Sequence, residues 1–214
     1  MKKLPLILIG GGGHCKSCID VIHKQDKYAI KGIIDANEPT GKTICGYIVL
    51  GNDSALPALI KEDNYFLITI GQIKSSALRE KIYDELNQAG AKMATVVSPI
   101  AYVSPDATIG DGSIVLHGAM INAAVVTGVN CIINSMALLE HDAKIGNHVH
   151  VSTGALINGD CSVANNCFIG SGAVMVNSTK ISDEVVIGAG SVVTKNITSP
   201  GIYAGNPAKR ISNE

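Results

Sequence analysis

The run Glu140-His141-Asp142 has the strongest potential for catalysis in this sequence, because it places an imidazole between two carboxylates. A carboxylate that accepts the Nδ1 proton of a histidine fixes the tautomer and raises the basicity of the ring, which leaves Nε2 free to take a proton from a substrate. Glu140 and Asp142 are equally close to His141 in sequence, so either could be that carboxylate. The run therefore predicts a general base at His141.

The element that positions this run is defined by a repeat of six residues. An aliphatic residue falls at every sixth position from Val97 to Val193, with Thr127 as the exception, and a small residue usually follows four positions later. This period is typical of a hexapeptide β-helix, in which three repeats close one triangular coil. Three cysteines occupy small inward positions and are expected to fill the core as free thiols: Cys131, Cys161 and Cys167.

Other histidines lie at fixed places in the same repeat. His150 alternates with inward-facing neighbours and should point outward, half a coil from His141 and on a different face of the prism. If both histidines serve one site, that site must lie between subunits. His148 falls at a turn, where we expect solvent, and His117 has no carboxylate neighbour in sequence and receives no role. The spacings among His141, His148 and His150 do not fit a zinc site.

The first 96 residues have a different pattern, in which apolar strands alternate with helices. We expect parallel strands over residues 4–9, 30–34, 65–70 and 93–97, with helices over 14–24, 54–61 and 75–89. This order predicts a small doubly wound sheet, and such sheets bind ligands at the carboxyl ends of their strands.

A glycine-rich turn joins the first of these strands to the first helix. Gly12 and Gly13 allow backbone N–H groups to approach a phosphate at the helix N-terminus, where the helix dipole favours anions. A complete dinucleotide fingerprint would need Gly or Ala at position 15, which is Cys15. The alternative is that the glycines only tighten the connection. Cys15 and Cys18 lie within the helix without a second cysteine pair, so no metal or redox site is expected there.

Composition excludes some classes of function. The chain has 214 residues, of which 46% are hydrophobic, and a formal net charge of −1, which argues against nucleic acids and membrane surfaces as partners. The apolar run 4–9 is too short for a signal-peptide core or a membrane span, so we expect a cytoplasmic protein. The predicted domains are residues 1–96 and 97–198, followed by a C-terminal tail, 199–214.

Several of these motifs together resemble a known family. The runs 140–142, 145–146 and 150–154 resemble the active-site region of left-handed β-helix acetyltransferases, and the ending 203–211 is similar to the tail of many of them. The N-terminal motifs narrow the resemblance to the branch that N-acetylates nucleotide-linked 4-amino sugars, of the bacillosamine type: Gly12-Gly13-His14, Asp35 and Gly71.

The resemblance implies a small Rossmann-like α/β domain, which binds the nucleotide-sugar, followed by a left-handed parallel β-helix. It implies acetyl transfer from acetyl-CoA to the 4-amino group of a UDP-linked amino-deoxy sugar in bacterial surface-glycan biosynthesis, by a homotrimer and without a metal. An O-acetyltransferase for sialic acid or a related nonulosonic acid is the alternative within the family. A nucleotide-sugar sensor without activity is the non-enzymatic alternative.

The resemblance also assigns roles by position. His141 matches the general base and Asp142 the acid that raises its basicity, with Glu140 as the alternative acid. Acetyl-CoA is expected in a groove between adjacent prisms, in contact with His150, Gly159, Ser171 and Ala189, and Lys195, Lys209 and Arg210 are candidates for its phosphates by charge. The nucleotide-sugar is expected to contact Gly12, Gly13, His14, Asp35 and Gly71. Ala36 replaces a second acid of the bacillosamine-type pattern, which leaves the preference for the nucleobase or for the sugar open.

Overall fold

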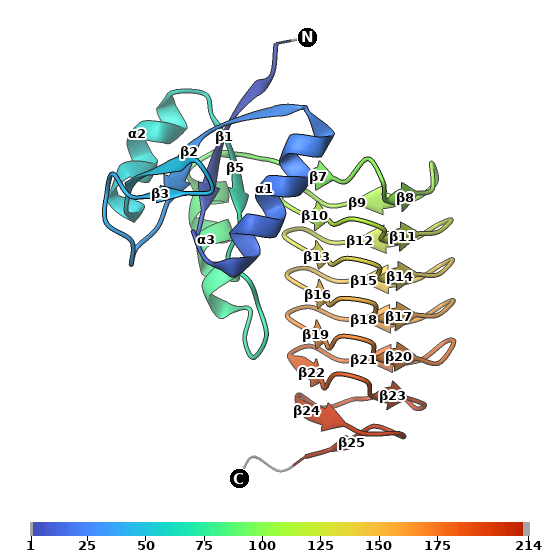
Figure 1. Ribbon diagram of the computed structural model, residues 1–214. Helices are drawn as coiled ribbons and strands as arrows, with labels where there is room; N and C mark the ends of the chain where they lie inside the picture. Colours follow the sequence, from blue (N-terminus) through green and yellow to red (C-terminus); the bar gives the residue numbers. More distant parts are fainter. Residues whose placement is uncertain (1, 212–214) are drawn as a thin grey trace.

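The computed structural model describes residues 2–211, which form two parts with different architectures. The first part is a sheet flanked by helices, and the second is a triangular prism of stacked coils, a left-handed parallel β-helix (Figure 1). The α/β part lies along one side of the prism, with hydrogen bonds that reach as far as Asn166 and Cys167, and the C-terminal end of the prism extends beyond it (Figure 1). No helix within residues 2–211 is both long enough and apolar enough to cross a membrane.

The α/β part is built on one sheet with the strand order β3-β4-β2-β1-β5-β6. The pairs are parallel except for the hairpin of β3 and β4. Alternation along β1 sends Leu6 and Leu8 into a core with α1, and Ile7 and Ile9 into a core with α3 on the other face. The elements are β1 (Leu4–Ile9), α1 (Gly13–Gln25), β2 (Tyr28–Ile34), β3 (Thr43–Ile44), β4 (Tyr47–Gly51), η1 (Asp53–Ala55), α2 (Leu56–Lys61), β5 (Tyr65–Ile68), α3 (Ala77–Gln88) and β6 (Lys92–Met93).

Two features of this part differ from the prediction. The hairpin of β3 and β4 was not expected, and its turn places Cys45 and Gly46 at positive φ, as a tight hairpin turn requires. The predicted strand 93–97 is divided between the two parts, because β6 pairs with β5 whereas Val96 and Val97 pair with the second coil of the prism. Ala94 and Thr95 therefore separate two sheets.

A complete coil of the prism contributes one short strand, of two or three residues, to each of three sides, and only five strands lie on the third side. The first side holds β7 (Val96–Val97), β10 (Ile114–Val115), β13 (Ile132–Ile133), β16 (His150–Val151), β19 (Phe168–Ile169) and β22 (Val185–Ile187). The second side holds β8 (Tyr102–Val103), β11 (Met120–Ile121), β14 (Leu138–Leu139), β17 (Leu156–Ile157), β20 (Val174–Met175) and β23 (Val192–Val193). The third side holds β9 (Thr108–Ile109), β12 (Val126–Thr127), β15 (Lys144–Ile145), β18 (Ser162–Val163) and β21 (Lys180–Ile181).

The interior of the prism is the predicted stack of aliphatic residues and small residues. Cys131, Cys161 and Cys167 are buried in it as free thiols. Thr127, the exception in the aliphatic series, is also buried, and its hydroxyl accepts a hydrogen bond from the N–H of Gly110 at 3.3 Å. A buried hydroxyl with a partner is tolerated in an apolar core, which explains why the series can continue through this position.

The corners of the prism share one backbone conformation. A residue with φ near +60° recurs every six positions from Gly112 to Gly190, and many of these residues are not glycine, among them Met136, Asp142 and His148. The left-handed conformation costs an L-residue about 1–2 kcal/mol. It is held here by stacking, since the N–H of the corner residue donates to a carbonyl of the preceding coil, as in Asp142 to Ala123 at 3.1 Å.

The C-terminal residues close the end of the prism. β24 (Gly201–Ala204) pairs in parallel with β22, and β25 (Lys209–Arg210) turns back to pair antiparallel with β24. Residues 212–214 of the predicted tail lie outside the described residues.

Apolar and polar contacts join the α/β part to the first side of the prism. Cys15 and Cys18 on α1 share a core with the outward residues of β7, β10 and β13. Nε2 of His117 donates to the carboxylate of Asp20 on α1 at 2.9 Å, and Nδ1 lies 2.6 Å from the hydroxyl of Ser98. The expectation that His117 lacks a carboxylate neighbour was therefore wrong. The fold brings Asp20 to it, although the two residues are 97 positions apart in the chain.

Candidate active site

The predicted general base lies on an open corner of the prism, between β14 and β15. Nδ1 of His141 lies 2.8 Å from Oδ2 of Asp142, and both side chains are 60% exposed. Glu140 contacts only the backbone N–H of His141, at 3.3 Å. The left-handed backbone at Asp142 folds its carboxylate back towards the preceding ring. The geometry therefore selects Asp142 as the partner of the ring.

The surroundings of His141 favour its protonated form. The hydrogen bond that the ring donates to Asp142 is the main cause that raises the pKa of His141, and the charges of Asp142, Glu140 and Asp160 add to it. Gly159 lies under the ring, because a Cβ atom there would come within 2.7 Å of both Cε1 and Nε2 of His141. A side chain at position 159 would displace the imidazole, so this glycine makes room for the ring.

A second site, an open pocket of about 640 Å³, lies where the carboxyl ends of β1, β2, β4 and β5 meet the prism. It contains all five residues predicted to hold the nucleotide-sugar, and His150 from the prism. Several lining residues were not predicted: Asn37, Asp53, Gln72, Ile73 and Asn134. We call this cavity the interdomain pocket.

The glycine turn presents bare backbone to the interdomain pocket. A Cβ atom at Gly12 or Gly13 would meet no heavy atom within 4 Å, so their surroundings are open. Gly12 precedes α1 in an extended conformation and no side chain caps the helix. Gly10 has a different role, because its φ of +100° and the close approach of Ile70 both exclude a side chain. The turn thus offers uncapped N–H groups to an anion.

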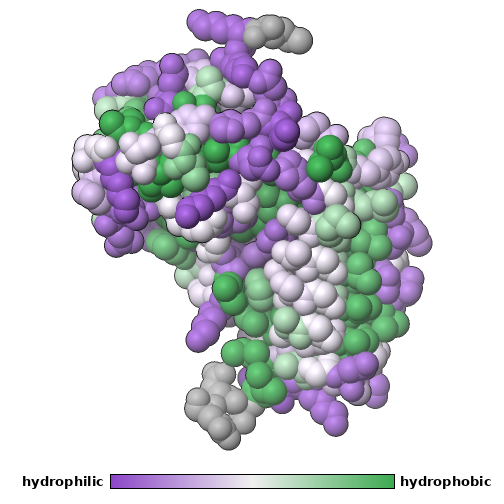
Figure 2. Space-filling view, in the orientation of Figure 1, coloured by the Kyte–Doolittle hydropathy of each residue, from purple (hydrophilic) through white to green (hydrophobic). Residues whose placement is uncertain are grey.

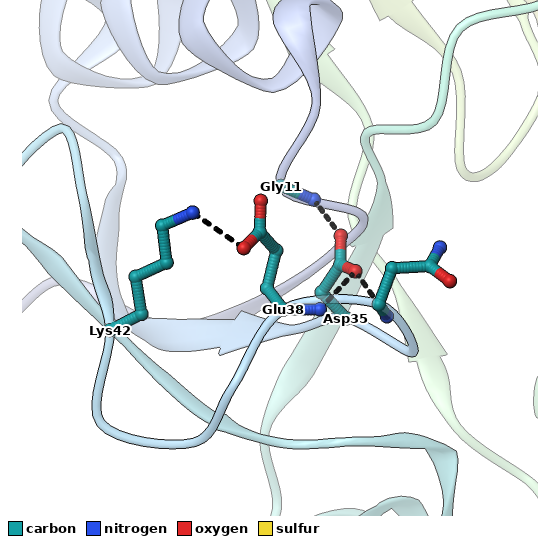
Figure 3. Close-up of polar contacts among 5 residues, drawn as sticks. Gly11, Asp35, Glu38 and Lys42 are labelled. Atoms are coloured by element: carbon teal, nitrogen blue, oxygen red, sulfur yellow. Dashed lines mark hydrogen bonds and ion pairs between the residues drawn. The ribbon is translucent and has the colours of Figure 1, made fainter.

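Asp35 shapes the pocket through its own backbone contacts (Figure 3). Oδ2 accepts the N–H of Gly11 at 2.6 Å, and Oδ1 accepts those of Asn37 and Glu38 at 2.8 and 3.2 Å. Glu38 in turn pairs with Lys42 at 2.6 Å. Both carboxylate oxygens of Asp35 are therefore engaged in holding the glycine turn beside the segment that follows β2.

His14 and His150 face each other in the pocket, with ring centroids 6.4 Å apart. His150 points outward from the prism as predicted by alternation, but the α/β part covers it and leaves it 6% exposed. Its Nδ1 lies 2.7 Å from the carbonyl of Gln72, which can only accept, so Nδ1 donates. Nε2 then accepts from the amide of Asn134 at 3.0 Å.

Burial holds this pair neutral. It lowers the pKa of His150 to about 4 and that of His14 to about 3, where the charge of Arg79 adds to the effect. Nε2 of His14 is buried and has no hydrogen-bond partner among the described residues. A buried polar atom without a partner calls for an explanation, and a hydrogen bond to a ligand in the adjoining pocket would supply one.

Arg79 is a buried residue that the sequence analysis did not identify. Its guanidinium is 1% exposed and donates to the carbonyls of Ile68 and Ile70 at 3.0 and 2.6 Å, and to the carbonyl and side-chain oxygens of Asn130 at 3.0 and 2.6 Å. Burial lowers its pKa to about 10, which still leaves it charged at neutral pH. Arg79 thus ties the strand end that precedes Gly71 to a corner of the prism.

His148 belongs to the same buried network. The expectation of a solvated turn histidine was wrong, because His148 is 6% exposed and its Nδ1 lies 3.0 Å from the amide nitrogen of Asn130. Burial lowers its pKa. The amide of Gln72 donates to the carbonyls of His148 and Cys167, which completes the polar seam between the two parts.

The predicted acetyl-CoA contacts are not brought together within one chain. Ser171 and Ala189 are exposed on the corner between the first and second sides, His150 lies in the interdomain pocket, and Gly159 lies with His141 on the corner between the second and third sides. His141 is therefore on the corner opposite the side that carries the α/β part. Within residues 2–211 there is no group of three or more His, Cys, Asp or Glu side chains that could hold a metal ion.

Comparisons with known proteins agree with both parts of the chain. Residues 5–86 match the PglD N-terminal domain, and residues 162–195 match the hexapeptide repeat of succinyl-transferase. A 113-residue segment is 33% identical to an uncharacterized protein of Acanthamoeba polyphaga mimivirus, and covers 53% of this chain and 21% of that protein. The chain thus spans about a fifth of the length of that curated relative.

Three solved structures are similar over the whole chain. The acetyltransferase domain of PglB from Neisseria gonorrhoeae is 30% identical with a TM-score of 0.89, covering 97% of this chain and 99% of that one. PerB from Caulobacter crescentus, in complex with CoA and GDP-perosamine, is 30% identical with a TM-score of 0.90, covering 97% of each chain. WeeI from Acinetobacter baumannii is 25% identical with a TM-score of 0.88, and the match covers 98% of this chain and 100% of that one.

The fold and these matches define the class as acyltransferases of the hexapeptide-repeat type. Within that class, the chain belongs to the family of acetyl-CoA-dependent sugar N-acetyltransferases that begin with a PglD-type N-terminal domain.

Proposed function

We propose that this protein transfers an acetyl group from acetyl-CoA to the amino group of a nucleotide-linked amino-deoxy sugar. The observation that carries the proposal is the pair of His141 and Asp142, whose geometry leaves Nε2 on an open corner to accept a proton. The similarity to PerB, whose solved complex contains CoA and GDP-perosamine, supports the two substrates. The predicted domain 1–96 would bind the nucleotide-sugar and 97–198 would carry the transfer chemistry, while residues 199–211 of the predicted tail would close the prism.

The chemistry follows from one general base. The neutral sugar amine attacks the thioester carbonyl while Nε2 of His141 takes its proton, so that a C–N bond forms. The tetrahedral intermediate then collapses, the C–S bond breaks, and the CoA thiolate takes the proton back from the imidazolium. Asp142 stabilises that imidazolium through its contact with Nδ1. General base catalysis contributes about 10²–10⁴-fold, and positioning of the two bound substrates supplies more.

The interdomain pocket suits the nucleotide-sugar. The uncapped start of α1 beside Gly12 and Gly13 would bind the diphosphate, and His14 with its free Nε2 lies next to that turn. Gly71 lies next to His14, because a Cβ atom at position 71 would come within 3.5 Å of the Cβ of His14, which is ordinary van der Waals contact. The carboxylate of Asp35 would act by holding the glycine turn, since its oxygens are already engaged.

A second copy of the chain is needed to complete the site. His141 and the interdomain pocket lie on different sides of one prism, so one chain cannot bring the general base His141 to a sugar bound in that pocket. The outward residues of the second side form an uncovered apolar column, in which Tyr102 is 53% and Met120 46% exposed. The column continues with Leu138, Leu156, Val174 and Val192. Figure 2 shows hydrophobic side chains gathered along this edge of the prism.

A cyclic trimer would satisfy this geometry. If the second sides of three prisms face a common axis, the corner with His141 and Gly159 of one copy meets the corner with Ser171 and Ala189 of the next, beside Asn134 and its pocket. Acetyl-CoA would lie in the groove between those corners. Its phosphates would reach the cavity of about 430 Å³ at the last coil, which Lys195, Lys209 and Arg210 line. We place the reaction in the cytoplasm, where acetyl-CoA is available.

The test is thiol release from acetyl-CoA by the purified protein. UDP- and GDP-linked 4-amino-4,6-dideoxy sugars and a free sialic acid are offered in parallel, and mass spectrometry locates the new acetyl group. Release with an amino sugar and acetylation at nitrogen are expected. Release with sialic acid alone would make the protein an O-acetyltransferase, and absence of release with every acceptor would contradict the proposal.

A further inference from the structure

The strand order arranges the walls of the interdomain pocket in a line. The strand ends follow each other as Asp53 after β4, Asn37 after β2, Gly12 and Gly13 after β1, and Ile73 after β5, and the prism with His150 comes last. Neighbouring strands are about 4.8 Å apart, so β4 and β5 are separated by about 14 Å. A nucleotide-sugar also has three parts in line, which are base, diphosphate and sugar.

The glycine turn fixes the direction in which the substrate lies. If the diphosphate binds the start of α1 in the middle of this line, the base and the sugar must extend to opposite ends. The amino sugar has to lie at the prism end, where the neighbouring copy would bring His141. The nucleobase then lies at the other end of the pocket, which the segments after β2 and β4 form and which we call the base end. This argument rests on the proposed function.

Few polar side chains remain free at the base end. The carboxylate of Asp35 is engaged by three backbone N–H groups, and Glu38 is paired with Lys42. Ala36 has no polar group. The carboxylate of Asp53 makes neither a hydrogen bond nor an ion pair with any residue between 2 and 211, and Asn37 lines the same pocket. Asp53 is thus the free carboxylate of this end.

A carboxylate can only accept hydrogen bonds, and it does so best from two adjacent donors. Guanine presents such a pair, N1–H and the N2 amino group, next to the O6 acceptor that an amide such as Asn37 can reach. Uracil presents a single N3–H between two carbonyl oxygens, one of which would face the second carboxylate oxygen. Adenine and cytosine place a ring acceptor beside their amino group. We propose that Asp53 recognises the base and that the preferred donor of the sugar is a guanine nucleotide.

Binding of free nucleotides tests this assignment without acetyl transfer. Titration calorimetry measures GDP, UDP, CDP and ADP on the full-length protein, on Asp53→Asn, and on Asp106→Asn as a control. Asp106 is an exposed carboxylate outside the pocket, so its substitution makes the same change of charge. Removal of one charge acts on all four diphosphates alike, and the ratio of GDP to UDP affinity is therefore the decisive quantity.

The wild type and the control should bind GDP about 10-fold or more tightly than the other nucleotides, and Asp53→Asn should lower the GDP to UDP ratio by about 10- to 100-fold. An unchanged ratio, a wild-type preference for UDP, or no nucleotide binding at millimolar concentration would each overturn the assignment. Acetyl transfer to a UDP-linked sugar with an unchanged ratio would leave the proposed function standing, whereas Asp53-dependent GDP binding without any transfer would contradict the proposed function alone.

Discussion

His141 and His150 are nine residues apart, yet their surroundings are opposite. His141 is on an open corner, where a carboxylate raises its pKa, whereas His150 is enclosed between the two parts of the chain, where burial lowers its pKa to about 4. The protonated form is favoured in the first ring, and the second is a neutral ring held in one tautomer by Gln72 and Asn134. The difference teaches that the repeat determines where each histidine lies on the prism, whereas the elements packed outside the prism determine its burial and therefore its pKa.

The largest effect should come from the open corner. Replacement of His141 by Ala is expected to lower turnover by about 10²- to 10⁴-fold, because the sugar amine loses its general base. Thermal unfolding should not change, since the side chain is mostly exposed and packs only over Gly159. Steady-state rates and circular dichroism of the same preparation measure both. Turnover near the wild-type level would remove His141 from the mechanism.

The enclosed region should respond in stability rather than in chemistry. Arg79→Met leaves the carbonyls of Ile68 and Ile70 and the side chain of Asn130 without their donor, so a loss of about 3–5 kcal/mol in the free energy of unfolding is expected. Lys81→Met on the same helix is the control, because its ion pair with Glu85 is exposed and long, at 3.8 Å. Urea unfolding of both variants should separate them clearly, and equal stability would show that the buried seam is dispensable.

Acid should destabilise the enclosed region next. The unfolded chain protonates its histidines near the ordinary pKa of 6.5, whereas folded His150 resists protonation down to about 4 and His14 to about 3. The unfolded state binds more protons in this range, so the contribution to stability is complete above pH 6.5 and is lost as the pH decreases towards 4 for His150 and towards 3 for His14. His150→Gln should flatten this decline in melting temperature, and a decline of the same slope in the variant would contradict the assignment.

The smallest effect should distinguish the two acids beside His141. Asp142 raises the pKa of His141, so the acid limb of kcat/KM lies above the position expected for an ordinary histidine. Asp142→Asn should move that limb to lower pH, because the ring loses its ionic partner, and should also reduce the plateau. Glu140→Gln should shift the limb less, since Glu140 contacts only the backbone. A larger shift in the Glu140 variant would reverse the two roles.

The prism could be predicted because its signal is local and repeated. Aliphatic and small residues recur at fixed offsets from Val97 onwards, and the stacked core follows from them. The α/β sheet was predicted only in its central strands, because the hairpin of β3 and β4 is short and carries little apolar pattern. The division of the predicted strand 93–97 was missed because this short segment, interrupted only by Thr95, serves two different sheets.

The contacts that sequence analysis missed are those between distant segments. Arg79 meets Asn130 across 51 residues and His117 meets Asp20 across 97, and neither spacing leaves a periodic trace in the sequence. The choice of Asp142 over Glu140 depends on a left-handed corner, which residue type alone does not reveal for an aspartate. The five residues predicted to hold the nucleotide-sugar do gather in one pocket, because each follows a parallel strand and parallel strands end at one edge.

Because a left-handed corner recurs at every sixth residue, the number of residues between two points of the prism is more tightly constrained than the types of those residues. Removal of six residues between the start of the prism and position 141 would move each later residue to the next side or corner of the prism. The imidazole of His141 would then lie on a different corner, even if every residue type were retained. Removal of 18 would keep the corner and shorten the distance to the α/β part by one strand spacing, about 4.8 Å. The distance along the prism between His141 and the α/β part can therefore change only by whole coils if His141 is to stay on the same corner.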